Sequence, residues 1–281
     1  MTKLNFIREK TFKEEIHRAG WNWVTKSLIN KFHDPKADII MDEFVERTFD
    51  WDYTFNNNKA LVLPHHKRNW IGVIHNPMII PKPFDIKQSP VNMCARLPFL
   101  LALKNCKGMY TLSSDLEESM RHLFMQYGFD HIPIETLIHP TPLNVEEFKL
   151  DEYLKDPQIT CIGYWLRNFE PFWLLDTDMT KNVLLGRLPY AHQTYQKQLE
   201  TFNLKTTFTG EKVKGNIIVH KHLENKEFDK YMTATVGFLN LIDTSANNGV
   251  TDCLSRNIPL LVNCHPAVVE YLGDDYPFYY N

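Results

Sequence analysis

The stretch that decides the fold covers residues 238–273 and reads FLNLIDTSANNGVTDCLSRNIPLLVNCHPAVVEYLG. An apolar run ends near Ile242, a polar turn follows over residues 243–249, and a helical segment then leads to a second apolar run that starts at Ile258. Short apolar runs bounded by turn residues are typical of strands that are covered on both faces. The stretch therefore predicts a strand, a helix and a parallel strand, with the turn at the carboxyl end of the first strand.

The polar turn brings several backbone N–H groups to the beginning of the predicted helix. Unpaired N–H groups and the helix dipole together favour a phosphate at such a position. An ordinary strand-to-helix turn explains the same spacing without a ligand. Neither a GxGxxG nor a Walker A sequence occurs in the chain, so the common dinucleotide and P-loop sites lack their main support.

Strand and helix patterns alternate through the rest of the chain, which predicts two α/β domains. Residues 139–157 are rich in proline and acidic residues and lack a sustained period, so we place the boundary there, between domains 1–150 and 151–281. Ligands of open parallel sheets bind beyond the carboxyl ends of the strands, and we expect the domains to face each other across a cleft. Helices are predicted at residues 12–32, 95–103 and 115–127, and further strands at residues 38–41, 60–63, 71–74, 109–112, 159–164, 182–185 and 216–220.

Composition excludes several classes of function. The 281 residues include 31 Lys and Arg against 34 Asp and Glu, a net charge of −3, which gives no basic field for nucleic acid. The longest apolar run, residues 97–103, is too short to span a membrane. The beginning of the sequence has no secretory signal pattern, so we expect a cytoplasmic protein, and we expect its five cysteines to be reduced thiols.

Residues 252–260, DCLSRNIPL, carry a resemblance to a known family. They resemble the Glu-Ala-x-x-x-Gly-x-Pro-Val motif of the group 1 (GT4-like) glycosyltransferases with the GT-B fold, most closely the short ones found in large DNA viruses and some bacteria. The resemblance implies two Rossmann-like domains, with the acceptor on the N-terminal one and a nucleotide-diphosphate sugar on the C-terminal one. Asp252 stands at the glutamate position. The resemblance implies that this carboxylate, in the first turn of its helix, accepts hydrogen bonds from the ribose hydroxyls; otherwise it is an acid that complements the helix dipole.

The paired-acid pattern of the family is broken in this chain, because Thr244 occupies the position of its first glutamate. Neighbouring side chains and backbone could hold the donor sugar or phosphate instead. These candidate donor-binding residues are Thr244, Ser245, Asn247, Asn248 and Gly249. Farther on, residues 266–272 resemble the family's second loop, with Glu270 as its acidic residue, although Glu270 could equally be a solvated charge.

Two more segments resemble the family. Residues 161–168, CIGYWLRN, resemble its first C-terminal strand, which implies that Arg167 meets the diphosphate, with Lys181 or Arg187 as further cations. Residues 70–77, WIGVIHNP, resemble the strand and histidine of the acceptor-side domain. His75 should then project from the strand end into the cleft and bind the transferred sugar or take a proton from the acceptor, unless it is a structural histidine. His220, at a predicted strand end, is a further candidate base or ribose contact.

Together these features predict a glycosyltransferase, a hexosyltransferase or similar enzyme, that is metal-independent and uses no cofactor. The resemblance implies a retaining reaction. Its partners would be a UDP- or GDP-sugar and a glycan, protein or small-molecule acceptor, in the host cytoplasm if the chain is viral. Two alternatives stay open. The chain could be an inactive carbohydrate- or nucleotide-binding module, since Thr244 replaces an acid, or a metal-dependent GT-A-like transferase that uses Asp176 and Asp178.

Overall fold

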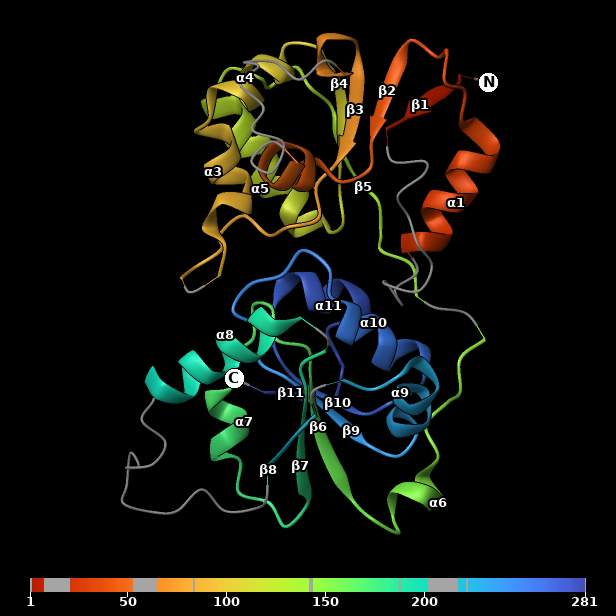
Figure 1. The fold of residues 1–281 in the computed structure, drawn as a ribbon, viewed down its shortest axis with the longest axis vertical. Helices are drawn as coiled ribbons and strands as arrows, with labels where there is room; N and C mark the ends of the chain where they lie inside the picture. Colours follow the sequence, from red (N-terminus) through yellow and green to blue (C-terminus); the bar gives the residue numbers. More distant parts are fainter. Residues whose placement is uncertain are drawn as a thin grey trace. The chain divides into compact units, whose positions relative to one another are not determined.

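The computed structural model describes residues 2–7, 21–52, 65–82, 84–141, 144–186, 188–201, 217–220 and 222–280. Internal contacts divide the chain into two units (Figure 1). The first comprises Met1–Pro140 and Asp243–Ala246, and the second Thr141–Ile242 and Asn247–Asn281. The predicted strand at residues 60–63 and the first part of the predicted helix at residues 12–32 lie outside the described residues.

The first unit contains a parallel sheet in which the strand order follows the chain, β1-β2-β3-β4-β5. Its helices include three that belong to the segments predicted as helical and a short one, α3, before α4. The strands are β1 (Leu4–Phe6), β2 (Ile39–Asp42), β3 (Trp70–Val73), β4 (Cys106–Thr111) and β5 (Ile134–Thr136). The α-helices are α1 (Trp21–Phe32), α3 (Pro90–Cys94), α4 (Leu97–Leu103) and α5 (Ser114–Gln126). The unit also contains a π-helix, η1 (Arg47–Asp52), and two 3-10 helices, η2 (His65–Lys67) and η3 (Ile86–Gln88).

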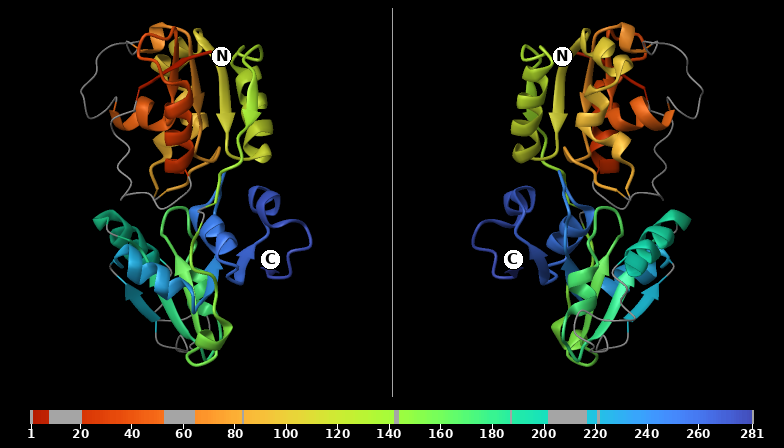
Figure 2. Two further views of the ribbon diagram at one scale, coloured as in Figure 1. Left: turned by 90° about the vertical axis from the view of Figure 1, so that its right-hand side faces the viewer. Right: turned by 90° about the vertical axis from the view of Figure 1, so that its left-hand side faces the viewer.

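Helices lie on both sides of this sheet (Figure 2). Alternate residues of its strands pack into two separate cores, one on each face of the sheet. Ile40 and Ile74 pack with α3, α4 and α5, whereas Met41 and Val73 pack with α1. This is the period-two pattern of a strand, in which successive side chains point to opposite faces. The apolar runs are therefore continuous because both faces are buried, as the sequence predicts.

The second unit contains a six-stranded parallel sheet with the order β8-β7-β6-β9-β10-β11. The chain first builds outward from β6 to β8 and then returns to the other side of β6 with β9. This is the order of a doubly wound nucleotide-binding fold, and the point of reversal lies between β6 and β9. The strands are β6 (Gln158–Ile162), β7 (Thr180–Leu184), β8 (Ile217–His220), β9 (Val236–Leu239), β10 (Leu260–Asn263) and β11 (Tyr279–Tyr280).

Helices cover both faces of this sheet as well. Cys161 and Phe238 share one core with α7 and α8, and Ile162 and Leu239 share the other with α9, α10 and α11. The helices are α6 (Leu150–Tyr153), α7 (Glu170–Leu174), α8 (Pro189–Thr201), α9 (Asn225–Met232), α10 (Asn248–Ser255) and α11 (Pro266–Leu272). None of the helices within the described ranges is long and apolar enough to cross a membrane.

The structure gives the bounds of two of the predicted helices. The helix predicted at residues 95–103 is α4, which begins two residues later than expected, at Leu97, because the backbone at Arg96 is extended and Pro98 suits the first turn of a helix; the short helix α3 precedes it. The helix predicted at residues 115–127 begins as expected, since the Ser113 hydroxyl accepts the Leu116 N–H and caps α5.

Candidate functional site

The loops that follow β6 and β9 meet at the point where the second sheet reverses its order. The Asn168 N–H donates to the Asn240 carbonyl at 3.0 Å, and the Ile242 N–H donates to the Leu166 carbonyl at 3.0 Å. In open parallel sheets a ligand binds at this place, outside the carboxyl ends of the two strands. Arg167 and the beginning of α10 both follow these strand ends, so two of the predicted site features are brought together.

Arg167 is buried, and its guanidinium is held from three directions. Nε donates to the Ile162 carbonyl at 3.1 Å and Nη1 to the Trp165 carbonyl at 2.9 Å. Nη2 donates to Oδ1 of Asn247 at 2.9 Å. The backbone turns tightly before it, because Gly163 and Leu166 both adopt the left-handed region, with φ of 77° and 53°. A leucine pays a conformational cost there, so the surrounding contacts must hold this loop in place.

The charge of Arg167 has no carboxylate partner within ion-pair distance in the described parts of the chain. Burial lowers the pKa of its guanidinium to about 10, so it remains protonated at neutral pH. A buried charge is ordinarily paired, because removing it from water costs several kcal/mol. The site is therefore built around a cation that an anionic ligand would neutralise.

Asn247 caps α10 with the same oxygen that Arg167 contacts. Its Oδ1 accepts the Gly249 N–H at 2.9 Å and the Val250 N–H at 3.4 Å, in addition to the guanidinium. Three donors thus converge on one amide oxygen. The sequence predicts open N–H groups for phosphate at this helix end; the structure corrects this, since the Asn247 side chain already occupies two of them.

Two of the other candidates follow on the same helix end. Asn248 is the exposed first residue of α10, and Gly249 is buried beside Arg167. A Cβ on Gly249 would lie 3.3 Å from Leu239 and 3.6 Å from the guanidinium, so a small residue is needed for this close approach.

Asp252 is the fifth residue of α10, in its second turn rather than in the predicted first, and it is only 6% exposed. Its burial argues against a solvated helix-dipole acid.

Thr244 and Ser245 belong to the first unit by their contacts. Both are buried, and the Ser245 hydroxyl donates to the carbonyl of His75, just after β3. The His75 ring is half-buried, with its centroid 4.5 Å from the rings of Trp21 and Phe44. Its Nε2 lies 2.8 Å from the carbonyl oxygen of Glu43. Because a carbonyl only accepts, Nε2 carries the hydrogen, and Nδ1 is the one ring nitrogen that can take a proton.

Glu46 holds the backbone of this histidine, and sequence reasoning missed it. Its Oε1 accepts the N–H groups of His75 and Asn76 at 2.7 and 2.6 Å, while Oε2 is buried and makes no hydrogen bond with the described residues. Burial raises the pKa of the Glu46 carboxyl to about 8, against the lowering effect of hydrogen bonds from the backbone of Asn76, Glu46 and His75; the charge of Asp42 adds a smaller increase. The segment that follows β2 mixes acidic and apolar residues, so nothing in the sequence distinguishes Glu46 from the acids around it.

Gly72 lets this glutamate approach the strand. A Cβ at Gly72 would lie 2.5 Å from Cγ2 of Val45, the neighbour of Glu46. We expect Gly72→Ala to destabilise the protein by about 1–3 kcal/mol in urea unfolding, since the 43–52 segment must shift. Gly108→Ala, in the adjacent strand, is the matched control, because its Cβ would meet nothing closer than 3.7 Å. Equal unfolding midpoints for the two variants would contradict this close packing.

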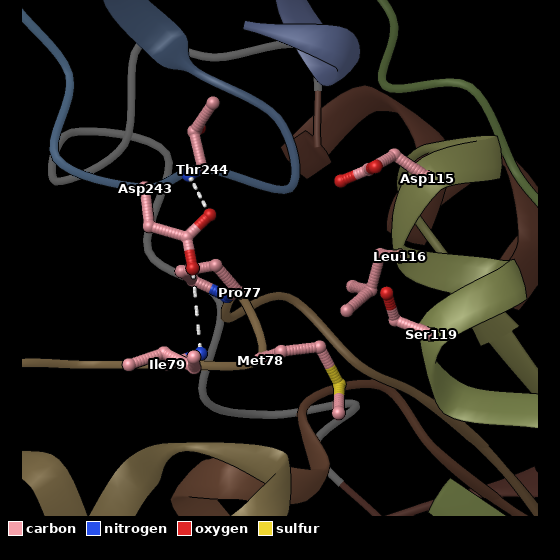
Figure 3. Close-up of a pocket in the computed structure, with 8 residues that line it drawn as sticks. All are labelled: Pro77, Met78, Ile79, Asp115, Leu116, Ser119, Asp243 and Thr244. Carbon is pink, nitrogen blue, oxygen red and sulfur yellow. Dashed lines mark hydrogen bonds between the residues drawn. The ribbon is translucent and has the colours of Figure 1, made fainter. Parts of the chain in front are cut away.

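A pocket of about 120 Å³ lies within the first unit, close to Thr244 (Figure 3). One wall is the start of α5, and the other is the turn at Asp243 and Thr244. Asp243 is fixed in it, since its Oδ1 accepts the Thr244 N–H at 2.7 Å and its Oδ2 accepts the Ile79 N–H at 3.3 Å. The lining residues are Pro77, Met78, Ile79, Asp115, Leu116, Ser119, Asp243 and Thr244.

The remaining candidates are not gathered at the sheet reversal. His220 ends β8, two strands away from β6, and its Nε2 lies 2.9 Å from Oδ1 of Asn182; burial lowers its pKa. Glu270 is exposed on α11. Lys181 is buried and its ammonium donates to the carbonyls of Trp173 and Leu175 at the end of α7, so it is a helix cap. Arg187 lies outside the described residues.

Asp176 and Asp178 lie before β7, at the edge of the sheet where the strands begin. Both are exposed. The ligand-binding edge of a doubly wound sheet is the opposite one, where the strands end. Within the described ranges no three His, Cys, Asp or Glu side chains are grouped so that they could hold a metal ion. The placement of the two aspartates therefore disfavours the metal-dependent alternative.

Comparisons with known proteins find similarity at the level of structure. No protein-family model matches the sequence, and no curated protein matches it. A sucrose-phosphate synthase from Thermosynechococcus elongatus is similar, with 8% identity and a TM-score of 0.53, over 89% of this chain and 61% of that one. A UDP-forming α,α-trehalose-phosphate synthase from Burkholderia xenovorans, in complex with glucose-6-phosphate, has 10% identity and a TM-score of 0.53 over 93% and 66%. A trehalose-6-phosphate synthase described for glycosyl transfer with retention has 9% identity and a TM-score of 0.50 over 93% and 67%.

These similarities show the fold. Two α/β units with parallel sheets are confirmed, and they match glycosyltransferases of the GT-B fold. The chain spans 61% and 66% of the length of the first two of these enzymes.

Proposed function

We propose that this chain is a glycosyltransferase that takes its sugar from a nucleotide-diphosphate donor, with the diphosphate bound between Arg167 and the beginning of α10. The donor would be a UDP-sugar, since the similar enzyme from B. xenovorans is UDP-forming. The single observation that carries the proposal is the buried, uncompensated guanidinium of Arg167 at the reversal of the second sheet. A departing diphosphate needs such a fixed positive charge.

The convergence of donors on Asn247 suggests how the diphosphate binds. An anionic oxygen placed where Oδ1 of Asn247 now lies would accept the same guanidinium N–H and the N–H groups of Gly249 and Val250. A hydrogen bond to a charged acceptor is about twice as strong as one to a neutral amide. The phosphate would displace the Asn247 side chain, and Asn248 and Ser245 would assist with the sugar or the second phosphate.

The remaining roles follow the family resemblance. Asp252 would hold the ribose hydroxyls. His75, with Nδ1 as its only acceptor nitrogen, would contact the transferred sugar or take a proton from the acceptor, and Thr244 would replace the missing acid beside the sugar. His220 and Glu270 have weaker support, given their places in the fold. Residues 1–150 and 151–281 would be the acceptor and donor domains.

We also propose that transfer is metal-independent and retaining. Arg167 can neutralise the diphosphate charge that a divalent ion neutralises in GT-A enzymes. Retention agrees with the similar trehalose-6-phosphate synthase described for transfer with retention. Assays with UDP-glucose in the presence and absence of EDTA test the first statement, and the anomeric configuration of the product by NMR tests the second. UDP binding without any transfer or hydrolysis would instead favour an inactive binding module.

The role of Asp252 can be tested by comparing UDP with a nucleotide that lacks the ribose hydroxyls. We expect Asp252→Asn to weaken UDP binding by about tenfold, because the charged acceptor of the ribose hydroxyls is lost. Binding of 2′,3′-dideoxy-UDP should be weak in the parent protein and unchanged in the variant. Calorimetry with both nucleotides measures this. An equal loss for both ligands would mean that Asp252 acts on the helix rather than on the ribose.

A further inference from the structure

The helix α8 buries one amide side chain, that of Gln198, and both ends of the amide contact the loop after β6 (residues 163–169). Its Nε2 donates to the Arg167 carbonyl at 2.8 Å, and its Oε1 accepts the Phe169 N–H at 3.2 Å. The orientation of the amide is fixed, because a carbonyl only accepts and a backbone N–H only donates. A buried amide destabilises a protein unless its polar groups are paired, and here both of them pair with the loop that carries the candidate cation.

Gln198 lies on the side of this loop that faces away from β9. On the other side, Arg167 forms an isolated antiparallel bridge with Leu241, and the neighbouring Asn168 N–H donates across that bridge. In a pair of this kind the carbonyl of the central residue points away from the partner strand. This is the carbonyl that Gln198 contacts, so its side chain takes the place that a second neighbouring strand would have.

The helix α8 also contacts both ends of the loop through aromatic rings. The ring centroid of Tyr190, at the start of α8, lies 5.5 Å from that of Tyr164, and the centroid of Tyr195 lies 4.8 Å from that of Phe169. Both pairs are edge to face, a favourable arrangement that tolerates a range of distances. The aromatic pairs therefore hold the helix against the loop, whereas the directional hydrogen bonds of Gln198 fix the backbone beside the cation.

We propose that Gln198 is a positioning residue for Arg167, because it holds the loop in the place where the guanidinium meets the diphosphate. This inference rests on the proposed function. The guanidinium is tied to the Trp165 carbonyl of the same loop, so the cation moves when the loop moves. Without the Gln198 amide the loop is in place in fewer molecules, and the apparent affinity for a diphosphate falls by that fraction.

The first test compares UDP binding by the parent protein, Gln198→Met and Tyr195→Phe. Methionine has about the length of glutamine but no N–H donor and no amide oxygen. Tyr195→Phe is the matched control, since on the same face of α8 it removes the hydrogen bond from Nε1 of Trp173 to the Tyr195 hydroxyl and keeps the ring. We expect both variants to lower the urea midpoint, and Gln198→Met alone to weaken UDP binding in calorimetry, by about tenfold. Unchanged UDP binding by Gln198→Met, or an equal loss in both variants, would overturn the inference.

The second test needs no nucleotide, so it separates this inference from the proposed function. The Asn168 and Ile242 N–H groups join the loops after β6 and β9, and their hydrogen exchange should be about tenfold faster in Gln198→Met than in Tyr195→Phe. Equal exchange rates would overturn the positioning role. Failure of the parent protein to bind UDP would overturn the transferase, and the exchange rates would still decide whether Gln198 holds the loop.

A second variant covers the case in which Gln198→Met does not fold by circular dichroism. Gln198→Glu then takes its place in both tests, because it keeps the acceptor for the Phe169 N–H and loses the donor to the Arg167 carbonyl. The same losses in UDP binding and in exchange protection are expected. If neither variant folds, Gln198 supports the second unit as a whole rather than this loop, and the inference is overturned.

Discussion

Asn247→Asp should make the protein more stable and, at the same time, nearly unable to bind a nucleotide diphosphate. The new carboxylate would lie 2.9 Å from the Arg167 guanidinium, where the amide oxygen lies now, and would pair a buried charge that has no carboxylate partner in the described residues. Aspartate caps a helix as well as asparagine does. We expect a gain of about 1–3 kcal/mol in the free energy of unfolding, typical of a hydrogen bond to a charged group.

The same carboxylate should repel the diphosphate and occupy its position. We expect UDP affinity to fall by about 100-fold, which a Coulomb energy of a few kcal/mol in a partly buried site supplies. Asn247→Ala separates charge from capping: it should cost about 1 kcal/mol of stability through loss of the cap, yet retain UDP binding within a few-fold. Thermal unfolding and calorimetry measure both quantities. Undiminished UDP binding by Asn247→Asp would remove the diphosphate from the beginning of α10.

Glu46→Gln should abolish a pH dependence of stability between about pH 5 and pH 8. The carboxyl has a pKa of about 8 in the folded protein, against 4.5 ordinarily, so the folded state keeps its proton when the unfolded chain has lost it. Stability from this group is complete below pH 4.5 and is lost as the pH rises through 8. The loss is on the order of a few kcal/mol. Glutamine can accept the His75 and Asn76 N–H groups through its amide oxygen but cannot ionise.

Urea unfolding of both proteins at pH 6, 7, 8 and 9 measures this difference. The stability of the parent protein should fall with pH relative to that of the variant, and the comparison cancels the histidines that titrate in the same range. Glu118→Gln, an exposed acid, serves as the control and should follow the parent curve. Parallel curves for parent and Glu46→Gln would show that Glu46 is ionised in the fold, and that the two N–H groups outweigh its burial.

Much of the sheet architecture can be predicted from the sequence, because its strands are buried on both faces. Residues 71–74 and 159–164 read as continuous apolar runs, and the structure places β3 and β6 there. The strands β1, β5 and β11 are two or three residues long and leave no such run. The order of the strands cannot be predicted from the sequence either, because the reversal between β6 and β9 depends on which strands pair, and pairing joins residues far apart in the chain.

The candidate site could likewise be predicted from the sequence only in part. Arg167 and Asn247 each follow a strand, so their local context suggests a ligand, and the structure brings them into contact. Asparagine is a preferred N-cap, so its position before α10 indicates that Asn247 could occupy the helix N–H groups, but its contact with Arg167 joins residues far apart in sequence and could not be predicted. Glu46 acts on a segment that lies far from it in sequence, because it accepts N–H groups of the loop after β3. The roles of the site residues stay predictions until the variants are measured.

The crossed backbone hydrogen bonds between the loops after β6 and β9 have an energetic consequence. With Leu166 held in a left-handed conformation and the guanidinium tied to two carbonyls, the conformational entropy of Arg167 is lost when the chain folds and not when a ligand arrives. Even inorganic pyrophosphate, which lacks the base and the ribose, should therefore compete with nucleotides for this cation.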